Sequence, residues 1–283
     1  MNNEIVVVMA FYKGQKYFKE QIDSIRKQTK LPDKLIIVND SPEDKKASNF
    51  LHKFNYGFLL NVEIIDNITN EGCTKAFYTG IQRAYKLGAK YIWISDQDDI
   101  WMLDKIELQY KVLRDGVDIC NHYSQKLVNE IPSTINFANS AGHTLAFNAK
   151  SFKKGIKLLA TPNYNISQIA MYDSILSFIP LIYNLKWETI SKPLVLHRLY
   201  TLEHSYLNSE MHKSFRQEIA NFYDGILAYS HMKNYIEQHS NIKISSKDIF
   251  KYYREHVNKY NLCDNQTKLK NYIFNILGQV ILS

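Results

Sequence analysis

The amino-acid sequence predicts an α/β protein built on a doubly wound sheet with helices on its faces. Over the first 115 residues, short apolar runs alternate with segments of helical periodicity, which is the pattern of strand–helix–strand units. The runs are apolar at consecutive positions, as expected of strands that are buried on both faces. Acidic residues directly follow two of these runs, at the edge of the sheet where such folds bind ligands.

A first strand is expected over residues 4–10 (EIVVVMA), followed by a helix over residues 15–28 whose apolar residues recur at helical spacing. The same alternation predicts strands over 35–40 (LIIVND), 62–66 (VEIID) and 91–95 (YIWIS), and helices over 71–87 and 104–113. In the helix over 71–87, the small residues Ala76, Gly80 and Ala84 lie four apart. The backbone of this helix can therefore approach the sheet closely.

The pattern is looser after residue 115. A glycine-containing segment at 140–148 (SAGHTLAFN) precedes an apolar helix at 166–179 and a strand at 192–197 (KPLVLH). From His204 onward the chain is rich in Lys, Asn and Tyr and shows helical periodicity. We therefore expect a helical extension over 205–283; its periodic apolar residues are Phe215, Ile219, Phe222 and Ile226.

Charge and cysteine content restrict the partners and the compartment. The formal net charge of +7 favours an anionic partner such as a nucleotide, a nucleic acid or an anionic membrane, although a solvated basic surface would give the same value. Cys73, Cys120 and Cys263 show neither zinc-ligand spacing nor a disulfide framework, which fits a reducing cytoplasm. No apolar run reaches the ~18 residues of a membrane-spanning helix. We expect a cytoplasmic protein that can still contact a membrane peripherally.

The stretch YIWISDQDDIW at 91–101 places Asp96, Asp98 and Asp99 directly after an apolar strand. Clustered carboxylates repel one another unless a cation lies between them. One interpretation is a solvated acidic turn that caps the helix starting near Asp104. An EF-hand is excluded because Trp101 occupies the position that requires glycine.

Two further interpretations involve nucleotides. The first strand is followed by FYKGQKYF, whose single glycine cannot form the G-x-G-x-x-G turn of a dinucleotide fold, so NAD is disfavoured. The other is a divalent metal that binds a nucleoside diphosphate. Carboxylate oxygens suit magnesium or manganese, and such a metal would replace the missing glycine-rich phosphate loop.

Four segments carry a resemblance to a known family: IVVVMAFYKGQKYFKEQIDSIRKQT, LIIVNDS, NEGCTKAFYTGIQRA and SDQDDIW. The sequence resembles the inverting family 2 nucleotide-sugar glycosyltransferases of the GT-A fold, especially their bacterial rhamnosyltransferase-like branch. The resemblance is strong over the first 115 residues and weakens toward residue 204. It implies a Rossmann-like mixed sheet in a catalytic domain over 1–204, with a donor half at 1–115 and an acceptor half at 116–204.

The resemblance also implies roles for the acidic residues. Asp40 would accept a hydrogen bond from the pyrimidine imide; an Asx turn with Ser41 and Pro42 is its structural alternative. Asp98 of the D-x-D motif would ligate Mn²⁺ or Mg²⁺, and Asp96 would bind the ribose, a metal-bound water or the metal itself. Asp99 would either join them or hold the loop. Other donor-site positions would be Ala10, Tyr12, Asn70, Gly72 and Arg198.

Asp173 is the candidate general base. It is the only carboxylate between Ile131 and Trp187, and it lies in an apolar helix where an unpaired charge is costly. In the relatives, an Asp in an H-D-W-W motif is the base; here Met171 to Ser174 keep the Asp but lack the His and the tryptophans. The alternative is an Asp on a partly exposed helix face, or one paired with a lysine.

The relatives also carry a Y-R-x-H motif near the metal. In this chain the residues are His197, Arg198, Leu199 and Tyr200, so the arginine is retained and the last histidine is not. His197 or His204 could take its place. The segment SAGHTLAFN is similar to one that lines the acceptor pocket, where Gly142 would admit a sugar and His143 would bind a hydroxyl; a tight turn would explain the glycine equally well.

The resemblance thus implies a cytoplasmic, metal-dependent, inverting glycosyltransferase that uses a UDP- or dTDP-sugar to extend a bacterial surface polysaccharide. The acceptor would be an oligosaccharide or a lipid-linked glycan. Residues 205–283 would contact the acceptor or the membrane, or form a homo-oligomer. A nucleotidyl- or phosphotransferase would need a basic glycine-rich loop, which is missing. A nucleic-acid-binding module is disfavoured because the acidic rim would repel phosphates.

Overall fold

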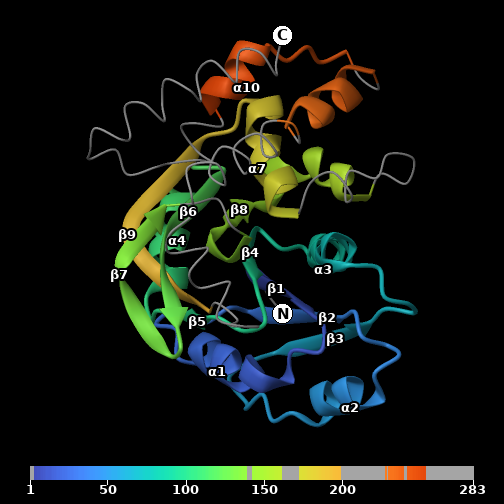
Figure 1. Cartoon of the computed structure of the whole chain (residues 1–283), viewed down its shortest axis with the longest axis vertical. Helices are drawn as coiled ribbons and strands as arrows, with labels where there is room; N and C mark the ends of the chain where they lie inside the picture. Colours follow the sequence, from blue (N-terminus) through green and yellow to red (C-terminus); the bar gives the residue numbers. More distant parts are fainter. Residues whose placement is uncertain are drawn as a thin grey trace.

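The computed structural model describes residues 3–138, 142–160, 172–198, 227, 229–238 and 241–252. One curled mixed sheet runs through the described part of the chain, with helices on both of its faces (Figure 1). The strand order is β3-β2-β1-β4-β8-β6-β9-β5, and β7 pairs with β6 outside this path. The sheet has a parallel half, β1 to β4, and a mixed half, β5 to β9.

The parallel half follows the predicted alternation. Its strands are β1 (Ile5–Phe11), β2 (Lys34–Asn39), β3 (Val62–Asp66) and β4 (Tyr91–Ser95), and β1 pairs in parallel with both β2 and β4. Alternate residues of β1 point to opposite faces: Val6 and Val8 join one core, and Val7 and Met9 join the other. Both faces are buried, which explains why the strand is apolar at every position.

Helices of this half cover both faces of the sheet. Helices α1 (Gln15–Arg26) and α2 (Lys45–Lys53) lie on one side, and α3 (Cys73–Lys86) lies on the other (Figure 1). A Cβ atom at Gly80 would lie 2.4 Å from Val8 Cγ1, which confirms that α3 needs a small residue there to approach the sheet. The helix α2 was not predicted; Asp44 caps it by accepting from the backbone N–H groups of Lys46 and Ala47.

The mixed half is more irregular. It contains β5 (Ile100–Trp101), α4 (Lys105–Arg114), β6 (Ile119–Val128), β7 (Ile131–Ala138), η1 (Gly142–Thr144), β8 (Ala146–Asn148), α5 (Ala149–Phe152), η2 (Gly155–Ala160), α7 (Tyr172–Tyr183) and β9 (Trp187–Arg198). The predicted helix at 166–179 and strand at 192–197 correspond to α7 and β9, although residues 166–171 lie outside the described part. The β6–β7 hairpin was not predicted.

The described part of the C-terminal region packs on α7. Residues 229–238 are helical, and α10 (Ser246–Tyr252) follows (Figure 1). The ring of Tyr229 lies edge-on to that of Phe178 at 4.8 Å, and the Tyr252 hydroxyl donates to the Ser177 carbonyl at 2.8 Å. Within the described residues, no helix is both long and apolar enough to cross a membrane. The proposed domain boundary at residue 204 and the periodic residues 215–226 lie outside the described residues.

Candidate active site

A cavity of about 820 Å³ opens at the carboxyl ends of β1, β2 and β4. Parallel strands place their carboxyl ends at one edge, so side chains distant in the sequence meet there. The cavity is lined by every residue to which the resemblance gave a donor or metal role, namely Ala10, Tyr12, Asp40, Asn70, Gly72, Asp96, Asp98 and Arg198. Their individual roles stay predictions. Among the other described residues that line it are Cys73, Phe77, Gln97 and His197.

The Asp40 carboxylate is buried and holds the loop that precedes α3. Its Oδ1 accepts from Asn67 Nδ2 at 2.7 Å and from the Glu71 N–H at 2.9 Å, while Oδ2 accepts from the Gly72 N–H at 2.8 Å. An ionised carboxylate has about four acceptor positions, so these contacts leave little capacity for a ligand. The alternative Asx turn belongs instead to Asn39, whose side chain accepts from the Ser41 N–H at 3.1 Å.

A glutamine joins the loops that follow β1 and β4. Gln97 Oε1 accepts from the Tyr12 N–H at 2.9 Å, and its Nε2 donates to the Tyr12 carbonyl at 3.2 Å. A Cβ atom at Gly14 would lie 2.1 Å from Gln97 Oε1. Gly14 is therefore required for the contact between the two loops rather than for a phosphate turn.

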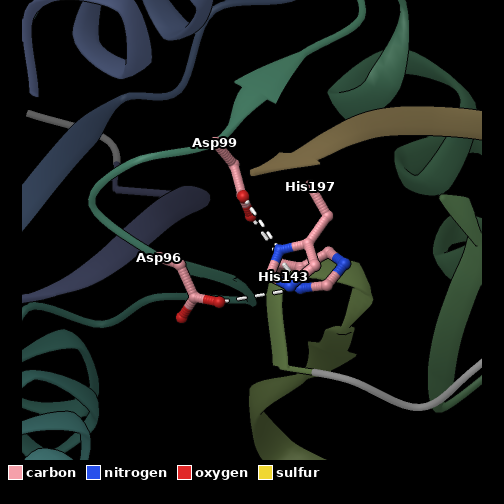
Figure 2. Close-up of side chains that lie close together, drawn as sticks. All are labelled: Asp96, Asp99, His143 and His197. Carbon is pink, nitrogen blue, oxygen red and sulfur yellow. Dashed lines mark hydrogen bonds and ion pairs between the residues drawn. The ribbon is translucent and has the colours of Figure 1, made fainter. Parts of the chain in front are cut away.

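The acidic loop divides its carboxylates between the cavity and the interior. Asp96 and Asp98 line the cavity, and the Asp96 side chain is 28% exposed. Asp99 is completely buried. Its Oδ1 accepts from His197 Nδ1 at 2.9 Å and from the Arg198 N–H at 3.1 Å (Figure 2). Asp99 thus anchors the loop to the end of β9, which is the structural role that the sequence left open for it.

Charges inside the molecule compensate the Asp99 carboxylate. Burial favours the neutral acid, but the neighbouring His197 and His143 hold the Asp99 pKa below its ordinary value. Burial also opposes protonation of His197, yet the Asp99 charge raises the pKa of this imidazole to about 9. His143, stacked on His197 with ring centroids 4.2 Å apart, has its pKa lowered by burial. At neutral pH, Asp99 and His197 therefore form an ion pair beside a neutral His143.

Four side chains could hold a metal ion. One donor atom from each of Asp96, Asp99, His143 and His197 lies within 4.8 Å of the others, as Figure 2 shows. Asp99 Oδ2 is buried without a hydrogen-bond partner among the described residues, and it lies 3.8 Å from His143 Nδ1. A cation would satisfy this acceptor. Sequence reasoning chose Asp96 and Asp98; the structure places Asp98 on the cavity but groups Asp96 with Asp99 and two imidazoles, while His204 lies outside the described residues.

A buried lysine behind this group was not predicted. Lys105 Nζ donates to the His143 carbonyl at 2.5 Å and lies 3.9 Å from the Trp101 ring centroid. Burial lowers the pKa of Lys105 to about 7, against the opposing effect of the Asp99 and Asp96 charges. The sequence gave no signal for it, because a lysine in the first turn of an amphipathic helix is ordinarily solvated.

Arg198 is held by protein carboxylates. Its side chain is 2% exposed, forms ion pairs with Glu20 at 2.5 Å and with Glu130, and lies 3.9 Å above the Tyr17 ring. Its Nε donates to the Asp98 carbonyl at 2.9 Å. Arg198 therefore ties the acidic loop to α1 and to the β6–β7 turn. Any contact with a diphosphate would compete with these carboxylates.

Asp173 occupies the first turn of α7 and is not among the residues that line the described cavity. Burial, together with the charge of Asp96, raises the pKa of its carboxyl to about 6, although the backbone N–H groups of Ser174 and Gly142 oppose the shift. Its neighbour Tyr172 occupies the space in front of Gly142: a Cβ atom there would lie 1.9 Å from the Tyr172 hydroxyl. The resemblance had implied that Gly142 would admit a sugar at this place.

Comparison with known sequences shows which proteins this chain is similar to. The family model described as "Glycosyl transferase family 2" matches residues 6–166. An uncharacterized glycosyltransferase of Methanocaldococcus jannaschii is 35% identical over 118 residues, covering 41% of this chain and 39% of the relative. The dTDP-rhamnosyl transferase RfbG of Shigella flexneri is 30% identical over 126 residues, covering 44% and 43%. The matches thus span about two fifths of the length of these relatives.

Solved structures share the fold at low identity. Residues 1–349 of TarS from S. aureus superpose with a TM-score of 0.53 at 14% identity, covering 98% of this chain and 89% of that chain. The same protein in complex with UDP-GlcNAc gives 0.58 at 13% identity, covering 98% and 81%. The mannosyltransferase PcManGT from Pyrobaculum calidifontis, in complex with GDP-Man and Mn²⁺, gives 0.54 at 14% identity, covering 81% and 63%. These likenesses bear on the fold alone.

Proposed function

Because the chain belongs to glycosyl transferase family 2 and has the GT-A fold, we propose that it transfers a sugar from a nucleotide-sugar to a glycan acceptor, with inversion at the sugar carbon. The observation that carries the proposal is the cavity at the carboxyl ends of β1, β2 and β4. It brings Asp40 within one site with Asp96 and Asp98. Asp40 at one end could contact a base, and Asp96 and Asp98 could hold a metal bound to a diphosphate.

The proposed donor is a UDP- or dTDP-sugar. A cavity of about 820 Å³ falls within the range of sites that enclose ligands of this size. A relative named as a dTDP-rhamnosyl transferase and a structural neighbour crystallised with UDP-GlcNAc support a pyrimidine base. Asp40 would receive the imide N–H at its remaining acceptor position, and the Asn70–Gly72 loop that it holds would border the nucleoside.

The proposed cofactor is Mn²⁺ or Mg²⁺. The carboxylates of Asp96 and Asp98 line the cavity. Donor atoms of Asp99, His143 and His197 lie within 4.8 Å of a carboxylate oxygen of Asp96. The buried Asp99 Oδ2, which lacks a hydrogen-bond partner among the described residues, fits a nearby cation. When bound, the ion would act as a Lewis acid that stabilises the departing diphosphate.

Asp173 is the proposed general base. Its pKa of about 6 leaves the carboxylate mostly ionised at neutral pH, yet basic enough to accept the proton of an acceptor hydroxyl. The first turn of α7 holds it rigidly through the bond from the Ser174 N–H at 2.7 Å. The acceptor would be an oligosaccharide or lipid-linked glycan of a bacterial surface polysaccharide. Residues 205–283 would provide peripheral contact with the inner face of the membrane, or a homo-oligomer interface.

Donor screening tests this proposal. The full chain is incubated with UDP-, dTDP- and GDP-sugars, with Mn²⁺ or with EDTA, and release of the free sugar and of the nucleoside diphosphate is measured. We expect metal-dependent hydrolysis of one pyrimidine donor. Release of a nucleoside monophosphate and a sugar phosphate would point instead to chemistry at the phosphorus, as in a nucleotidyltransferase. Hydrolysis that is indifferent to EDTA would remove the metal.

A further inference from the structure

Tyr172 forms a direct link between the acidic loop and the helix that carries Asp173. It is the first residue of α7, and its hydroxyl donates to Asp96 Oδ1 at 2.8 Å. The two residues are 76 positions apart in the sequence, and the tyrosine side chain is almost completely buried.

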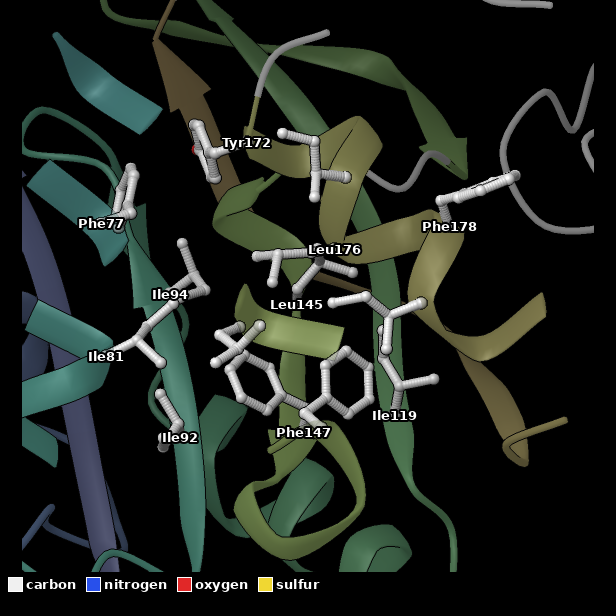
Figure 3. Packing of buried hydrophobic residues seen from close by; sticks show 14 of the residues in the cluster. Phe77, Ile81, Ile92, Ile94, Ile119, Leu145, Phe147, Tyr172, Leu176 and Phe178 are labelled. Atoms are coloured by element: carbon white, nitrogen blue, oxygen red, sulfur yellow. The ribbon is translucent and has the colours of Figure 1, made fainter. Parts of the chain in front are cut away.

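The tyrosine is held in a fitted space. Its ring packs on Phe77 of α3, with centroids 4.1 Å apart and planes inclined by 33°, and the two rings lie side by side at the edge of the core in Figure 3. On the opposite side, Gly142 leaves room for the hydroxyl, because a Cβ atom there would lie 1.9 Å from it. A ring enclosed in this way has little rotational freedom, so the hydroxyl is directed at Asp96 before any ligand arrives.

We propose that Tyr172 is a positioning residue that fixes the Asp96 carboxylate for metal-dependent binding of the donor diphosphate; this rests on the proposed function. Its hydroxyl takes one acceptor position of Asp96 Oδ1 and so fixes the direction in which Oδ2 faces a cation. Oδ2 lies 3.6 Å from His143 Nδ1, on the side of the group formed by Asp99, His143 and His197. A hydrogen-bonded carboxylate that presents one oxygen in a fixed direction loses less freedom on binding a metal.

The same contact sets the position of the base. Asp173 follows Tyr172 directly, so anchoring the Tyr172 hydroxyl to the acidic loop also fixes the start of α7 relative to the metal-binding side chains. Loss of the hydroxyl should therefore weaken metal binding directly, and it should slow transfer as a consequence. A purely structural tyrosine would instead change the stability and leave the affinity for metal unchanged.

The test compares Tyr172→Phe with Tyr252→Phe in the full chain. The control removes the hydroxyl of a partly buried tyrosine that bonds to the same helix, at the Ser177 carbonyl, but far from the acidic loop. Mn²⁺ binding is followed by electron paramagnetic resonance of the free ion, alone and with UDP or dTDP, and stability by thermal unfolding. We expect Tyr172→Phe to lower Mn²⁺ affinity about 10- to 100-fold, the usual effect of losing a ligand-orienting hydrogen bond. Saturating Mn²⁺ should restore nucleotide binding, and the control should bind Mn²⁺ like the wild type.

A second variant, Gly142→Ala, reaches the same contact from the other side, and its Cβ should displace the hydroxyl and weaken Mn²⁺ binding similarly. Equal Mn²⁺ affinity in folded Tyr172→Phe and wild-type protein overturns the inference, and so does a wild-type chain that binds no Mn²⁺. Weakened Mn²⁺ binding in the variant, in a chain that binds no nucleotide, would show that Tyr172 positions Asp96 for a metal but would overturn both its role in donor binding and the proposed glycosyl transfer.

Discussion

Strands β1 and β4 of the parallel half and the segments β6 and η1 of the mixed half bury different kinds of side chain. In the parallel half, β1 and β4 bury almost only apolar residues, which contribute by area and can substitute for one another. In the mixed half, β6 and η1 bury Asn121, His122 and His143. Each buried polar group needs a particular partner. The apolar strands β1 and β4 therefore form a tolerant scaffold, and the site depends on polar contacts from both halves, those of Asp40 at the end of β2 and those of His143 and His197 in the mixed half.

The largest expected effect concerns Asp173 of the mixed half. Asp173→Asn keeps the shape of the side chain and removes its basicity, so transfer should fall about 10²–10⁴-fold while Mn²⁺-dependent nucleotide affinity stays near the wild-type value. In the wild type, kcat/KM should rise with pH through about 6, where the carboxyl loses its proton. Rates measured from pH 4.5 to 8 check both. A folded variant with the wild-type rate would place the base elsewhere, with Asp99 the next residue to test.

Next in size is the ion pair between the buried Asp99 carboxylate and the partly exposed His197 imidazole. Asp99→Ala should lower the free energy of unfolding by about 1.5–3 kcal/mol, because His197, whose side chain is 33% exposed, loses its charged hydrogen-bond partner. Asp98→Ala, at the cavity, should abolish metal-stimulated UDP binding with little loss of stability. Ile36→Val in the parallel half should cost only about 0.5–1.5 kcal/mol. Denaturant titration in EDTA measures all three stabilities, and calorimetry measures the binding. Equal destabilisation by Asp98→Ala and Asp99→Ala would contradict the division of the loop.

The same pair predicts a pH dependence. The folded-state pKa of His197, about 9, is above its unfolded value, so its stabilisation is complete below pH ~6.5 and is lost as pH rises through 9. The lowered pKa of Asp99 gives stabilisation that is present above pH ~4 and is lost in acid. Lys105, whose folded-state pKa of about 7 lies below its unfolded value, gives the opposite trend over the same pH range, so the His197 contribution is measured as the difference in stability between wild-type and His197→Gln metal-free protein. This difference should shrink between pH 6 and pH 10, and a constant difference would mean that His197 does not titrate near 9.

A smaller effect is expected for the Asp173 carboxyl. Its folded-state pKa of about 6 lies above the unfolded value, so its ionisation destabilises the native state as pH rises from ~4 to 6. Asp173→Asn should therefore raise the stability at pH 7.5 by about 1–3 kcal/mol, since each pKa unit corresponds to ~1.4 kcal/mol. The gain should vanish at pH 4. Thermal unfolding at the two pH values measures it, and a loss at pH 7.5 would show that the charged form is well paired.

The smallest effect concerns the turn of the β6–β7 hairpin. Asn129 and Glu130 both have positive φ, at +50° and +63°, where glycine is favoured. Glu130→Gly relieves the backbone but removes one partner of Arg198, so the free energy of unfolding should change by no more than about 1 kcal/mol. If Arg198 contacts the diphosphate, UDP affinity should increase, since one competing carboxylate is gone. Glu130→Gln keeps a non-glycine residue at positive φ and removes the carboxylate. Calorimetry on this variant therefore separates the effect of the lost charge from that of the relieved backbone.

The sequence predicted the elements of the parallel half more accurately than those of the mixed half. The strands at 62–66 and 91–95 were placed at their correct ends, because an apolar run bounded by polar residues is a local signal. Asp40, Asp96 and Asp98 could be expected to meet, because parallel strands align their carboxyl ends. The β6–β7 hairpin was missed because its turn, Asn129-Glu130, lacks the glycine that usually marks one.

The candidate site was predictable only in part, for a related reason. His143 and Asp99 are 44 positions apart by residue number, and no periodicity connects them. Lys105 looked like an ordinary solvated lysine at a helix start, yet it is fully buried beside the His143 carbonyl. Contacts of this kind arise from tertiary packing of irregular segments. Asp173 was chosen because it is isolated in a long segment without other carboxylates, which is a signal of composition rather than of geometry, and its role stays a prediction.

The contacts of Arg198 connect the tip of the β6–β7 hairpin to the acidic loop, so a probe at the tip could report on movement of that loop. Glu130 connects the tip to Arg198, and Arg198 Nε holds the Asp98 carbonyl of the acidic loop at 2.9 Å. The adjacent Ile131 is 69% exposed. A fluorophore attached at Ile131 would lie next to Glu130, which is connected through Arg198 to the acidic loop at the cavity. Rearrangement of the acidic loop would then be read as an optical signal at the surface, without labelling the site itself.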